Sequence, residues 1–119
     1  MAEHNELGKK GEEAALEYLI HEGYKILETN WRRGHAEIDI IAADGRFIVI
    51  VEVKTRVSEY VSPQESVTRK KQKLLIQAAD AYITAKHLKS EVRFDIVTVI
   101  VEGEKKRISH LKDAFYPTL

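Results

Sequence analysis

The sequence predicts an α/β domain in which a mixed β-sheet is flanked by helices and the elements follow the order αβββαβ. Two stretches with helical spacing of apolar residues enclose a β-prone middle, and the turn signal Asp44-Gly45 separates two of its strands. The chain has 119 residues, of which 44% are hydrophobic and 32% charged, a balance typical of one globular unit. No repeat or linker-like segment divides it, so we expect residues 1–119 to form a single domain.

The first helix is predicted from Gly8 to Ile20, with Gly23 as its stop signal. Small and apolar side chains recur there at helical spacing, while lysines and glutamates fill the positions between them. The face expected to be buried comprises Gly8, Gly11, Glu12, Ala15, Leu16, Leu19 and Ile20.

Three strands are predicted next, at residues 24–31, 37–42 and 47–54. A loop at residues 32–34 separates the first two. The last two should pair across Asp44-Gly45 as an antiparallel hairpin.

The second half of the chain predicts a loop at residues 55–62 and then a helix from an N-cap at Thr68 to about His87. A last main strand at residues 92–101 should pair in parallel after this crossover, and the tail from Lys105 to Leu119 should add a short edge strand and a turn. The stripe of the helix expected to be buried comprises Leu75, Ala78, Ala79, Tyr82 and Ile83.

Composition restricts the chemistry. There is no cysteine, which excludes disulfides and thiolate metal sites, and the five histidines show no paired spacing. A metal would therefore be held by carboxylates, which favours Mg²⁺ or Mn²⁺. The formal net charge is zero, so nucleic-acid binding would depend on local basic patches.

No apolar run reaches the roughly 18 residues of a membrane span, and the start Met-Ala-Glu-His-Asn-Glu lacks the basic and apolar regions of a signal peptide. We therefore expect a cytoplasmic protein that does not partner a membrane.

The candidate site is a cluster of charged residues on the predicted hairpin. Side chains alternate along a strand, so Glu37 and Asp39 share one face of their strand, and Glu52 and Lys54 share one face of the next. A turn of two or four residues brings these faces together, with Glu37 opposite Glu52 and Asp39 diagonal to it. A three-residue turn would place the acids on opposite faces.

Two interpretations of this cluster follow. Ile48 and Ile50 precede Glu52 on the same face, so the carboxylates should be partly buried, and buried like charges need a cation or a proton. A divalent metal held by Asp39 and Glu52 would supply it. The alternative is a salt bridge from Lys54 to one of the acids, without a metal.

Glu12 is a third acid in an unexpected place, because it lies on the buried face of the first helix beside glycines that allow close packing. It could be a tolerated charge near the helix N-terminus. Alternatively, it converges on the hairpin site as a third carboxylate.

A basic run, Arg69-Lys70-Lys71-Gln72-Lys73, occupies the start of the second helix, where phosphate groups are favoured and cations oppose the helix dipole. Lys71 and Gln72 continue the buried stripe and could face the site, whereas Arg69, Lys70 and Lys73 should meet solvent or phosphates. Arg32, Arg33 and Arg56 could extend the basic track. Trp31 is expected to be a core residue rather than a base-stacking one.

The ordered set of motifs resembles the PD-(D/E)XK nuclease superfamily and, more closely, the YraN-like family of small uncharacterised bacterial proteins. The matching segments are Gly8-x-x-Gly11-Glu12-x-x-Ala15, Gly23-Tyr24-x-Ile26-Leu27, Asn30-Trp31-Arg32, Glu37 to Ala42, Val51-Glu52-Val53-Lys54-x-Arg56, and Lys71 to Tyr82. Two positions depart from it: Ile38 replaces the proline of the superfamily name, and Ala36 stands where the nearer family usually has glycine.

The resemblance implies a restriction-endonuclease-like αβββαβ core and kinship with archaeal Holliday junction resolvases, which act as dimers. It implies that Asp39 and Glu52 bind Mg²⁺ (or Mn²⁺), that Glu12 completes the acidic site, and that Lys54 orients or deprotonates the attacking water. Glu37 and Gln72 are lesser candidates. A homodimer is expected by analogy only.

The leading hypothesis is a metal-dependent endonuclease that hydrolyses DNA phosphodiesters, with branched DNA or repair intermediates as candidate substrates. A non-catalytic nucleic-acid-binding module of a recombination or repair complex is the first alternative. A structural domain held by a salt-bridge cluster is the second.

Overall fold

A computed structural model describes residues 2–57 and 67–117 of the chain. Its elements are α1 (Ala2–His21), β1 (Lys25–Arg33), β2 (Ala36–Asp44), β3 (Phe47–Arg56), α3 (Arg69–Ala85), β4 (Glu91–Glu102) and β5 (Lys105–Phe115). The strands form one sheet in the order β1-β2-β3-β4-β5, in which only β3 and β4 are parallel. This mixed sheet with helices confirms the predicted α/β fold class and is consistent with a restriction-endonuclease-like core.

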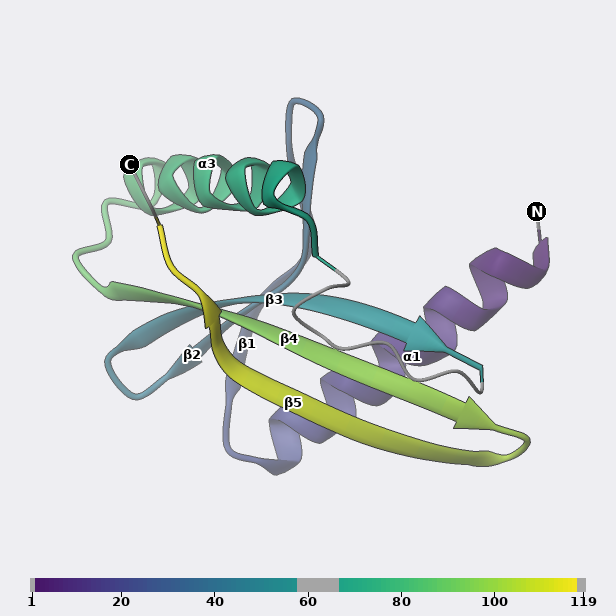
Figure 1. Cartoon of the computed structure of the whole chain (residues 1–119). Coiled ribbons are helices and arrows are strands. Elements are labelled where there is room, and N and C mark those ends of the chain that lie inside the picture. Colours follow the sequence, from purple (N-terminus) through teal and green to yellow (C-terminus); the bar gives the residue numbers. More distant parts are fainter. Residues whose placement is uncertain (1, 58–66, 118–119) are drawn as a thin grey trace.

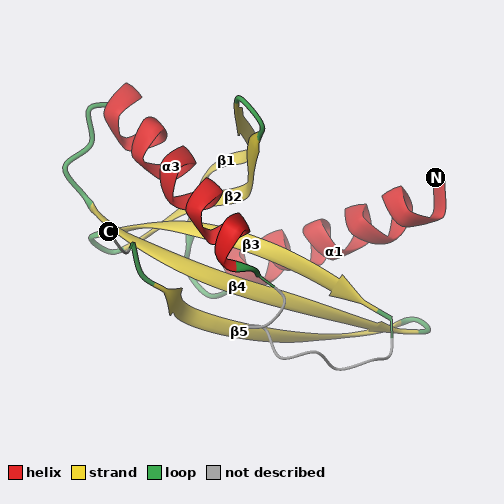
Figure 2. Ribbon diagram, turned by 45° about the horizontal axis from the view of Figure 1, so that its top comes forward, coloured by secondary structure: helices red, strands yellow, loops and turns green. Residues whose placement is uncertain are grey.

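The two helices cover opposite faces of the sheet (Figures 1 and 2). The α3 side encloses a cluster that includes Ile50, Leu75 and Phe94. The α1 side encloses a second cluster that includes Leu19 and Val51. Alternate residues of the central strands β3 and β4 enter the two clusters, which is why both strands are almost continuously apolar.

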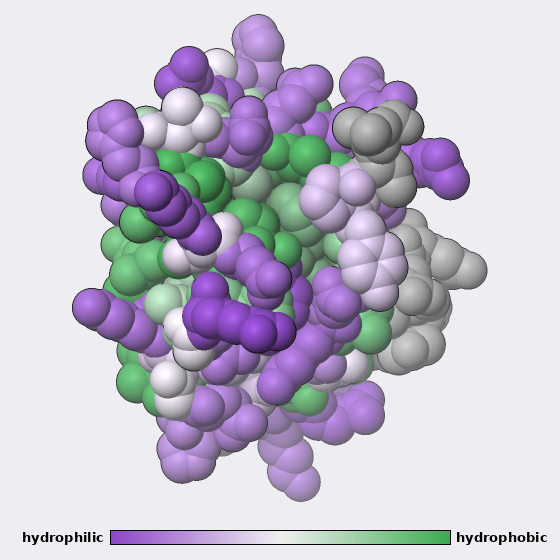
Figure 3. Space-filling model, turned by 90° about the vertical axis from the view of Figure 1, so that its left-hand side faces the viewer, coloured by the Kyte–Doolittle hydropathy of each residue, from purple (hydrophilic) through white to green (hydrophobic). Residues whose placement is uncertain are grey.

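The α3-side cluster reaches the surface at the end of the molecule that carries the β2–β3 turn and the α3–β4 connection. Seen from there, hydrophobic residues gather in the middle of the face with hydrophilic ones around them (Figure 3). A shallow cavity of about 160 Å³ lies between Ile83, Val92 and Phe94. In the described residues, neither helix has an apolar stretch long enough to cross a bilayer.

Helix α1 starts six residues earlier than predicted, and Gly23 follows it with a φ of +94°. Ala15 and Leu19 are fully buried, as predicted, whereas Ile20 is 59% exposed. The prediction for Ile20 was wrong because the buried stripe is centred on positions 11, 15 and 19, and residue 20 is rotated by about 100° from its centre.

The hairpin of β2 and β3 forms as predicted, but its turn is one residue further along the chain. Asp44 pairs with Phe47, so Gly45 and Arg46 are the two turn residues, with Gly45 first and at a φ of +58°. Ile40 consequently lies opposite Val51. The predicted register of Glu37 opposite Glu52 is wrong: continuing the ladder by one residue beyond Ile40–Val51 makes Asp39 the residue that faces Glu52.

The β1–β2 hairpin is longer than predicted, since the strands continue to Arg33 and from Ala36 and only Gly34-His35 remains as the turn. Its outer half leaves the plane of the sheet and stands beside α3 (Figure 1). The bend lies at Asn30, whose φ is +50°, between the pairs Thr29–Ile40 and Trp31–Ile38.

Helix α3 begins as predicted at Thr68, whose hydroxyl accepts a hydrogen bond from the Lys71 backbone N–H. Its predicted stripe is buried except for Ile83, which is half-buried. The parallel pairing of β4 with β3 is confirmed, whereas β5 is a full 11-residue strand rather than a short one. The predicted loop at residues 55–62 is wrong at its start, because β3 continues to Arg56, and from residue 58 it lies outside the described residues.

Candidate active site

Glu52 lies on the face of β3 that α3 covers. It is 4% exposed, and its Oε2 atom lies 3.3 Å from Lys54 Nζ and 3.7 Å from Lys71 Nζ. The first of these ion pairs is the one that the metal-free interpretation predicts. The other oxygen, Oε1, is buried and has no hydrogen-bond partner among the described residues. Because a buried carboxylate oxygen without a donor is costly, Oε1 is an atom at which a ligand would lower the free energy.

Asp39 lies on β2, where the ladder to β3 ends. Its Oδ2 atom accepts a hydrogen bond of 2.8 Å from the Val53 backbone N–H, which the neighbouring strand no longer satisfies. Burial raises the pKa of Asp39 to about 7, and the negative charge of Glu52 adds to the rise, while the Val53 hydrogen bond opposes it. Two carboxyl groups are therefore close enough that both ionise only at an energetic cost.

The bend of the β1–β2 hairpin sets the position of Asp39. Ile38 packs into the α3-side cluster and Ile40 into the α1-side cluster, so the usual alternation breaks between them. At this point the β1–β2 ladder contains no Asn30–Asp39 pair. The left-handed backbone conformation of Asn30 accommodates the break in alternation. The Asp39 side chain can thus reach both the end of β3 and the α1 side of the sheet.

Glu12 comes from α1, which approaches β3 closely at Gly11. A Cβ atom on Gly11 would lie 1.9 Å from Thr55 Oγ1 and 2.9 Å from Thr55 Cβ, so only glycine permits this distance. Gly8, in contrast, has no other described atom within 4 Å of such a Cβ. Of the two glycines expected to allow close packing, only Gly11 does so.

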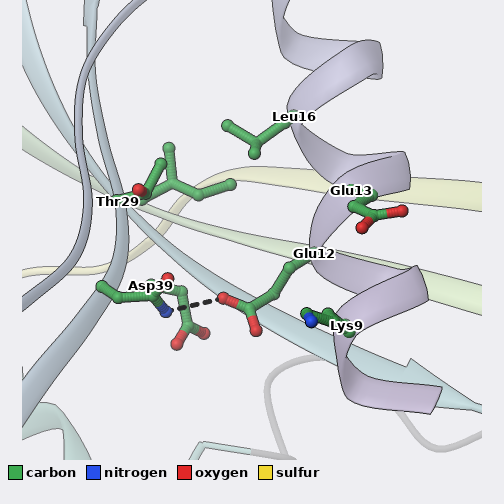
Figure 4. A pocket seen from close by; sticks show the side chains of 8 residues that line it. Lys9, Glu12, Glu13, Leu16, Thr29 and Asp39 are labelled. Atoms are coloured by element: carbon green, nitrogen blue, oxygen red, sulfur yellow. Dashed lines mark hydrogen bonds between the residues drawn. The ribbon is translucent and has the colours of Figure 1, made fainter. Parts of the chain in front are cut away.

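Glu12 and Asp39 point into the same pocket of about 140 Å³ between α1 and the hairpin (Figure 4). The Asn30 amide donates to Glu12 Oε1 at 2.8 Å and to Glu37 Oε1 at 3.2 Å. The charge of Glu12 also raises the pKa of Asp39. Glu12 and Glu52 thus approach Asp39 from two other elements, α1 and β3.

Within residues 2–57 and 67–117, no three Asp, Glu, His or Cys side chains are already spaced to hold a metal ion together. Magnesium is nevertheless commonly bound through one or two carboxylates, with water and substrate oxygens completing its shell. Lys54 and Lys71 both contact Glu52 Oε2, but Oε1 has no partner among the described residues, and the pKa of Asp39 is raised by burial and by the charge of Glu52. Their chemistry suits a hard divalent cation.

The predicted basic residues occupy three kinds of position. Lys71 lies beside the site, because its ammonium group contacts Glu52. Three others, Arg69, Lys70 and Lys73, are exposed on the first turns of α3. Arg32 forms an exposed ion pair with Glu37 at 3.0 Å.

Two further predicted residues point elsewhere. Gln72 donates to the Val67 carbonyl at 3.0 Å rather than facing the acids, and Arg56 donates to the Thr55 carbonyl at 3.1 Å. Trp31 packs edge-on against Tyr82 with ring centres 5.3 Å apart, as expected for a core residue.

A scan against protein-family models matches residues 11–99 to the uncharacterised protein family UPF0102. The chain belongs to UPF0102. The matched range contains Glu12, Asp39, Glu52, Lys54 and Lys71. The resemblance to the YraN-like family is thereby confirmed.

Curated UPF0102 proteins resemble the chain over its whole length. One from Bacteroides thetaiotaomicron is 53% identical over 120 residues, covering 100% of this chain and 99% of that protein. Another from Flavobacterium psychrophilum is 50% identical over 117 residues, covering 98% of each. A third from Flavobacterium johnsoniae is 53% identical over 121 residues, again covering 98% of each.

Sequence reasoning missed two residues of this UPF0102 site. Asn30, which joins Glu12 to Glu37, interrupts the alternation of a predicted strand and could have been noticed for that reason. Thr98 lies on β4 beside Lys54, and its hydroxyl is buried without a partner among the described residues. Thr98 could have been noticed in the sequence because it is the lone polar residue within the apolar run from Ile96 to Val101.

A second polar cluster, also missed, lies under the other end of α1. Asp95 is 1% exposed and accepts hydrogen bonds from Arg93 at 2.9 and 3.0 Å, from the Asp113 backbone N–H at 3.0 Å, and contacts His110 Nε2 at 2.7 Å. His110 Nδ1 contacts the Tyr18 hydroxyl at 2.8 Å. Burial raises the pKa of Asp95, but the bonds to His110 and Arg93 outweigh it and hold the pKa below its usual value. This cluster ties α1, β4 and β5 together.

Proposed function

We propose that this UPF0102 protein is a cytoplasmic, metal-dependent endonuclease that hydrolyses DNA phosphodiesters. The observation that carries the proposal is the convergence of Glu12, Asp39 and Glu52 from three elements, with Lys54 in contact with Glu52. The fold and the resemblance to the PD-(D/E)XK superfamily support the same reaction class. Branched DNA and repair intermediates are the substrates that this kinship favours.

Asp39 and Glu52 would hold Mg²⁺ or Mn²⁺, with Glu12 completing the acidic site. Bound there, the metal would polarise a phosphoryl oxygen and lower the pKa of a water molecule. In the reaction, the water oxygen would form a new bond to phosphorus and give up one proton to solvent, the bond from phosphorus to one sugar oxygen would break, and the released alkoxide would take up a proton.

Lys54 would orient the attacking water. An ion-paired ammonium has only hydrogens to donate, and its 3.3 Å contact with Glu52 keeps it beside the acids. Lys71, 3.7 Å from the same oxygen, would neutralise a phosphate that enters from the α3 side.

A non-catalytic nucleic-acid-binding module is the rival function, and the ion pairs of Glu52 favour it. Lys54 and Lys71 already offset the negative charge of Glu52 through one of its oxygens. The described residues therefore neutralise much of this charge without a metal. A basic start of α3 would serve binding equally well.

The test is cleavage of linear, flapped and four-way DNA in the presence of Mn²⁺ by the wild type, Asp39→Asn and Lys54→Ala. The exposed Glu104→Ala is a matched control. We expect cleavage by the wild type and control and at least a hundredfold loss in the other two, the order of magnitude for removing a catalytic group. Equal nicking by all four proteins would indicate a contaminant. Binding without cleavage would favour the module.

Calorimetry with Mn²⁺ separates both functions from a purely structural domain. Heat that disappears in Asp39→Asn and in Glu52→Gln is expected. Unchanged heat in both variants would remove the metal site from the proposal.

A further inference from the structure

The outer half of the β1–β2 hairpin and α3 enclose a groove that the site described above does not include. Its volume is about 390 Å³. Arg33, His35 and Ala36 line it from the hairpin, and Leu74, Gln77 and Ala81 line it from α3. We refer to it as the hairpin groove.

The hairpin groove has apolar walls and polar groups at one side. Ala36, Leu74 and Ala81 are half-buried, whereas Arg33, His35 and Gln77 are exposed. The Gln77 amide can donate and accept hydrogen bonds at once, and a guanidinium plane can stack on a flat ring. Apolar walls with these groups fit a nucleobase, which has two apolar faces and a hydrogen-bonding edge.

The groove is close to the acids along two elements. Gln77 is six residues beyond Lys71, a distance of about 9 Å along α3, and Lys71 contacts Glu52. Ala36 is three residues before Asp39, about 10 Å along β2. A nucleic-acid strand with a phosphate at the acids can therefore place a neighbouring base at the groove.

Positive charge connects the two places. Lys70 and Lys73 are exposed and lie four residues before Leu74 and Gln77, so they occupy the same side of α3. The first turn of α3 contains no acidic residue, and the nearby Glu37 is paired with Arg32. The next acid on this side of the helix is Asp80, which is exposed and lies three residues beyond Gln77, so phosphates can follow α3 from Lys70 to Gln77 without facing an acidic side chain of the helix.

We propose that the hairpin groove binds the base of an unpaired nucleotide next to the phosphodiester at the acidic site. A base in a duplex is stacked and paired, so its faces cannot enter such a groove. The preferred ligand is therefore a nucleic acid with a single-stranded segment, such as a flap or a fork. This inference rests on the proposed function for the position of the phosphate, but base binding can be measured without cleavage.

The experiment uses the full chain in EDTA with a single-stranded oligonucleotide that carries 2-aminopurine, and a blunt duplex of the same sequence as competitor. Ala81→Phe fills the groove, and Ala85→Phe places the same ring one turn further on the same side of α3, outside the groove. We expect the wild type and Ala85→Phe to change the 2-aminopurine fluorescence. Ala81→Phe should bind the single strand about tenfold more weakly, as for loss of one base contact, and the duplex equally well.

Gln77→Ala is a second variant, because it shortens an exposed helix residue and should not impair folding. We expect it to weaken single-strand binding severalfold. Wild-type affinity and fluorescence in both groove variants would overturn the proposal.

The Mn²⁺ cleavage assay on the same proteins separates the two proposals. Single-strand binding that is sensitive to Ala81→Phe, without any cleavage, would support the groove and overturn the endonuclease. Cleavage that depends on Asp39, with unchanged binding by both groove variants, would do the reverse.

Discussion

The Asp39 carboxylate accepts a 2.8 Å hydrogen bond from the backbone N–H of Val53, on the adjacent strand. This bond takes the place of the next rung of the β2–β3 ladder, which ends at Ile40–Val51. The strands separate where the acids lie, and the separation brings Asp39 toward Glu52 and Glu12 at once. One side chain thus links the end of the sheet to the candidate chemistry.

The pH dependence of stability should reveal this carboxylate. The pKa of Asp39 is about 7 in the folded protein, above its unfolded value of about 3.9. The folded state then binds the extra proton, so the free energy of unfolding falls as pH rises from about 4 to 7. Without divalent metal, we expect a loss on the order of 4 kcal/mol across this window, of which roughly 2–3 kcal/mol falls between pH 5 and pH 8, where urea unfolding measures it.

Asp39→Asn is the matched control for this titration, because the amide oxygen can still accept the Val53 hydrogen bond. It should remove the pH-dependent loss, and Mn²⁺ should restore stability at pH 8 to the wild type alone. A wild-type loss that persists unchanged in Asp39→Asn would assign the titration to another group.

The contact of α1 with β3 predicts opposite effects for two glycines of one helix. Gly11→Ala forces a Cβ against the Thr55 side chain, which is stiff because it is β-branched, and should cost about 1–3 kcal/mol. Gly8→Ala meets no described atom and should stabilise the helix by roughly 0.5–1 kcal/mol. Thermal unfolding of both variants and of the double variant Gly11→Ala with Thr55→Gly measures this, and the double variant should regain part of the loss. Equal effects of the two glycine variants would contradict the close approach.

The sequence was sufficient for the fold class and for the elements, because the periodicities and turn signals are local. It was also sufficient for the matching faces of Asp39 and Glu52, which a two-residue turn preserves, but not for Glu37, because the alternation along β2 breaks between Ile38 and Ile40. The register was wrong because Asp44-Gly45 identifies a turn without fixing which residue is at its first position.

The rest depends on contacts between distant segments. The bend at Asn30 follows from how the hairpin packs beside α3, and a left-handed asparagine leaves little trace in composition. The buried network of Asp95 joins residues from three elements. The only sign of this network in the sequence is Asp95 itself, an acid within a largely apolar strand.

Lys71 should contribute to nucleic-acid binding as one phosphate contact. If DNA binds as proposed, Lys71→Ala should weaken binding at low salt and reduce the slope of log affinity against log salt by about one. Lys89→Ala removes an exposed lysine between α3 and β4 and should leave that slope unchanged. Fluorescence anisotropy in EDTA at several salt concentrations measures both. The prediction is wrong if the two variants have the same slope.

Asp95 should matter for folding and not for the acidic site. Asp95→Asn leaves Arg93 and His110 with a neutral partner in a buried position and should cost about 3 kcal/mol at pH 7.

The pKa of Asp95 is lowered in the folded protein, so its stabilisation is present above the unfolded value of about 3.9 and is lost as pH falls through the folded value. This loss on the acid side is opposite in direction to that of Asp39. Urea unfolding from pH 2 to pH 7 should show it in the wild type and not in Asp95→Asn, while Mn²⁺ binding by the folded variant stays unchanged. A variant that keeps wild-type stability but loses Mn²⁺ binding would instead assign Asp95 to the metal site.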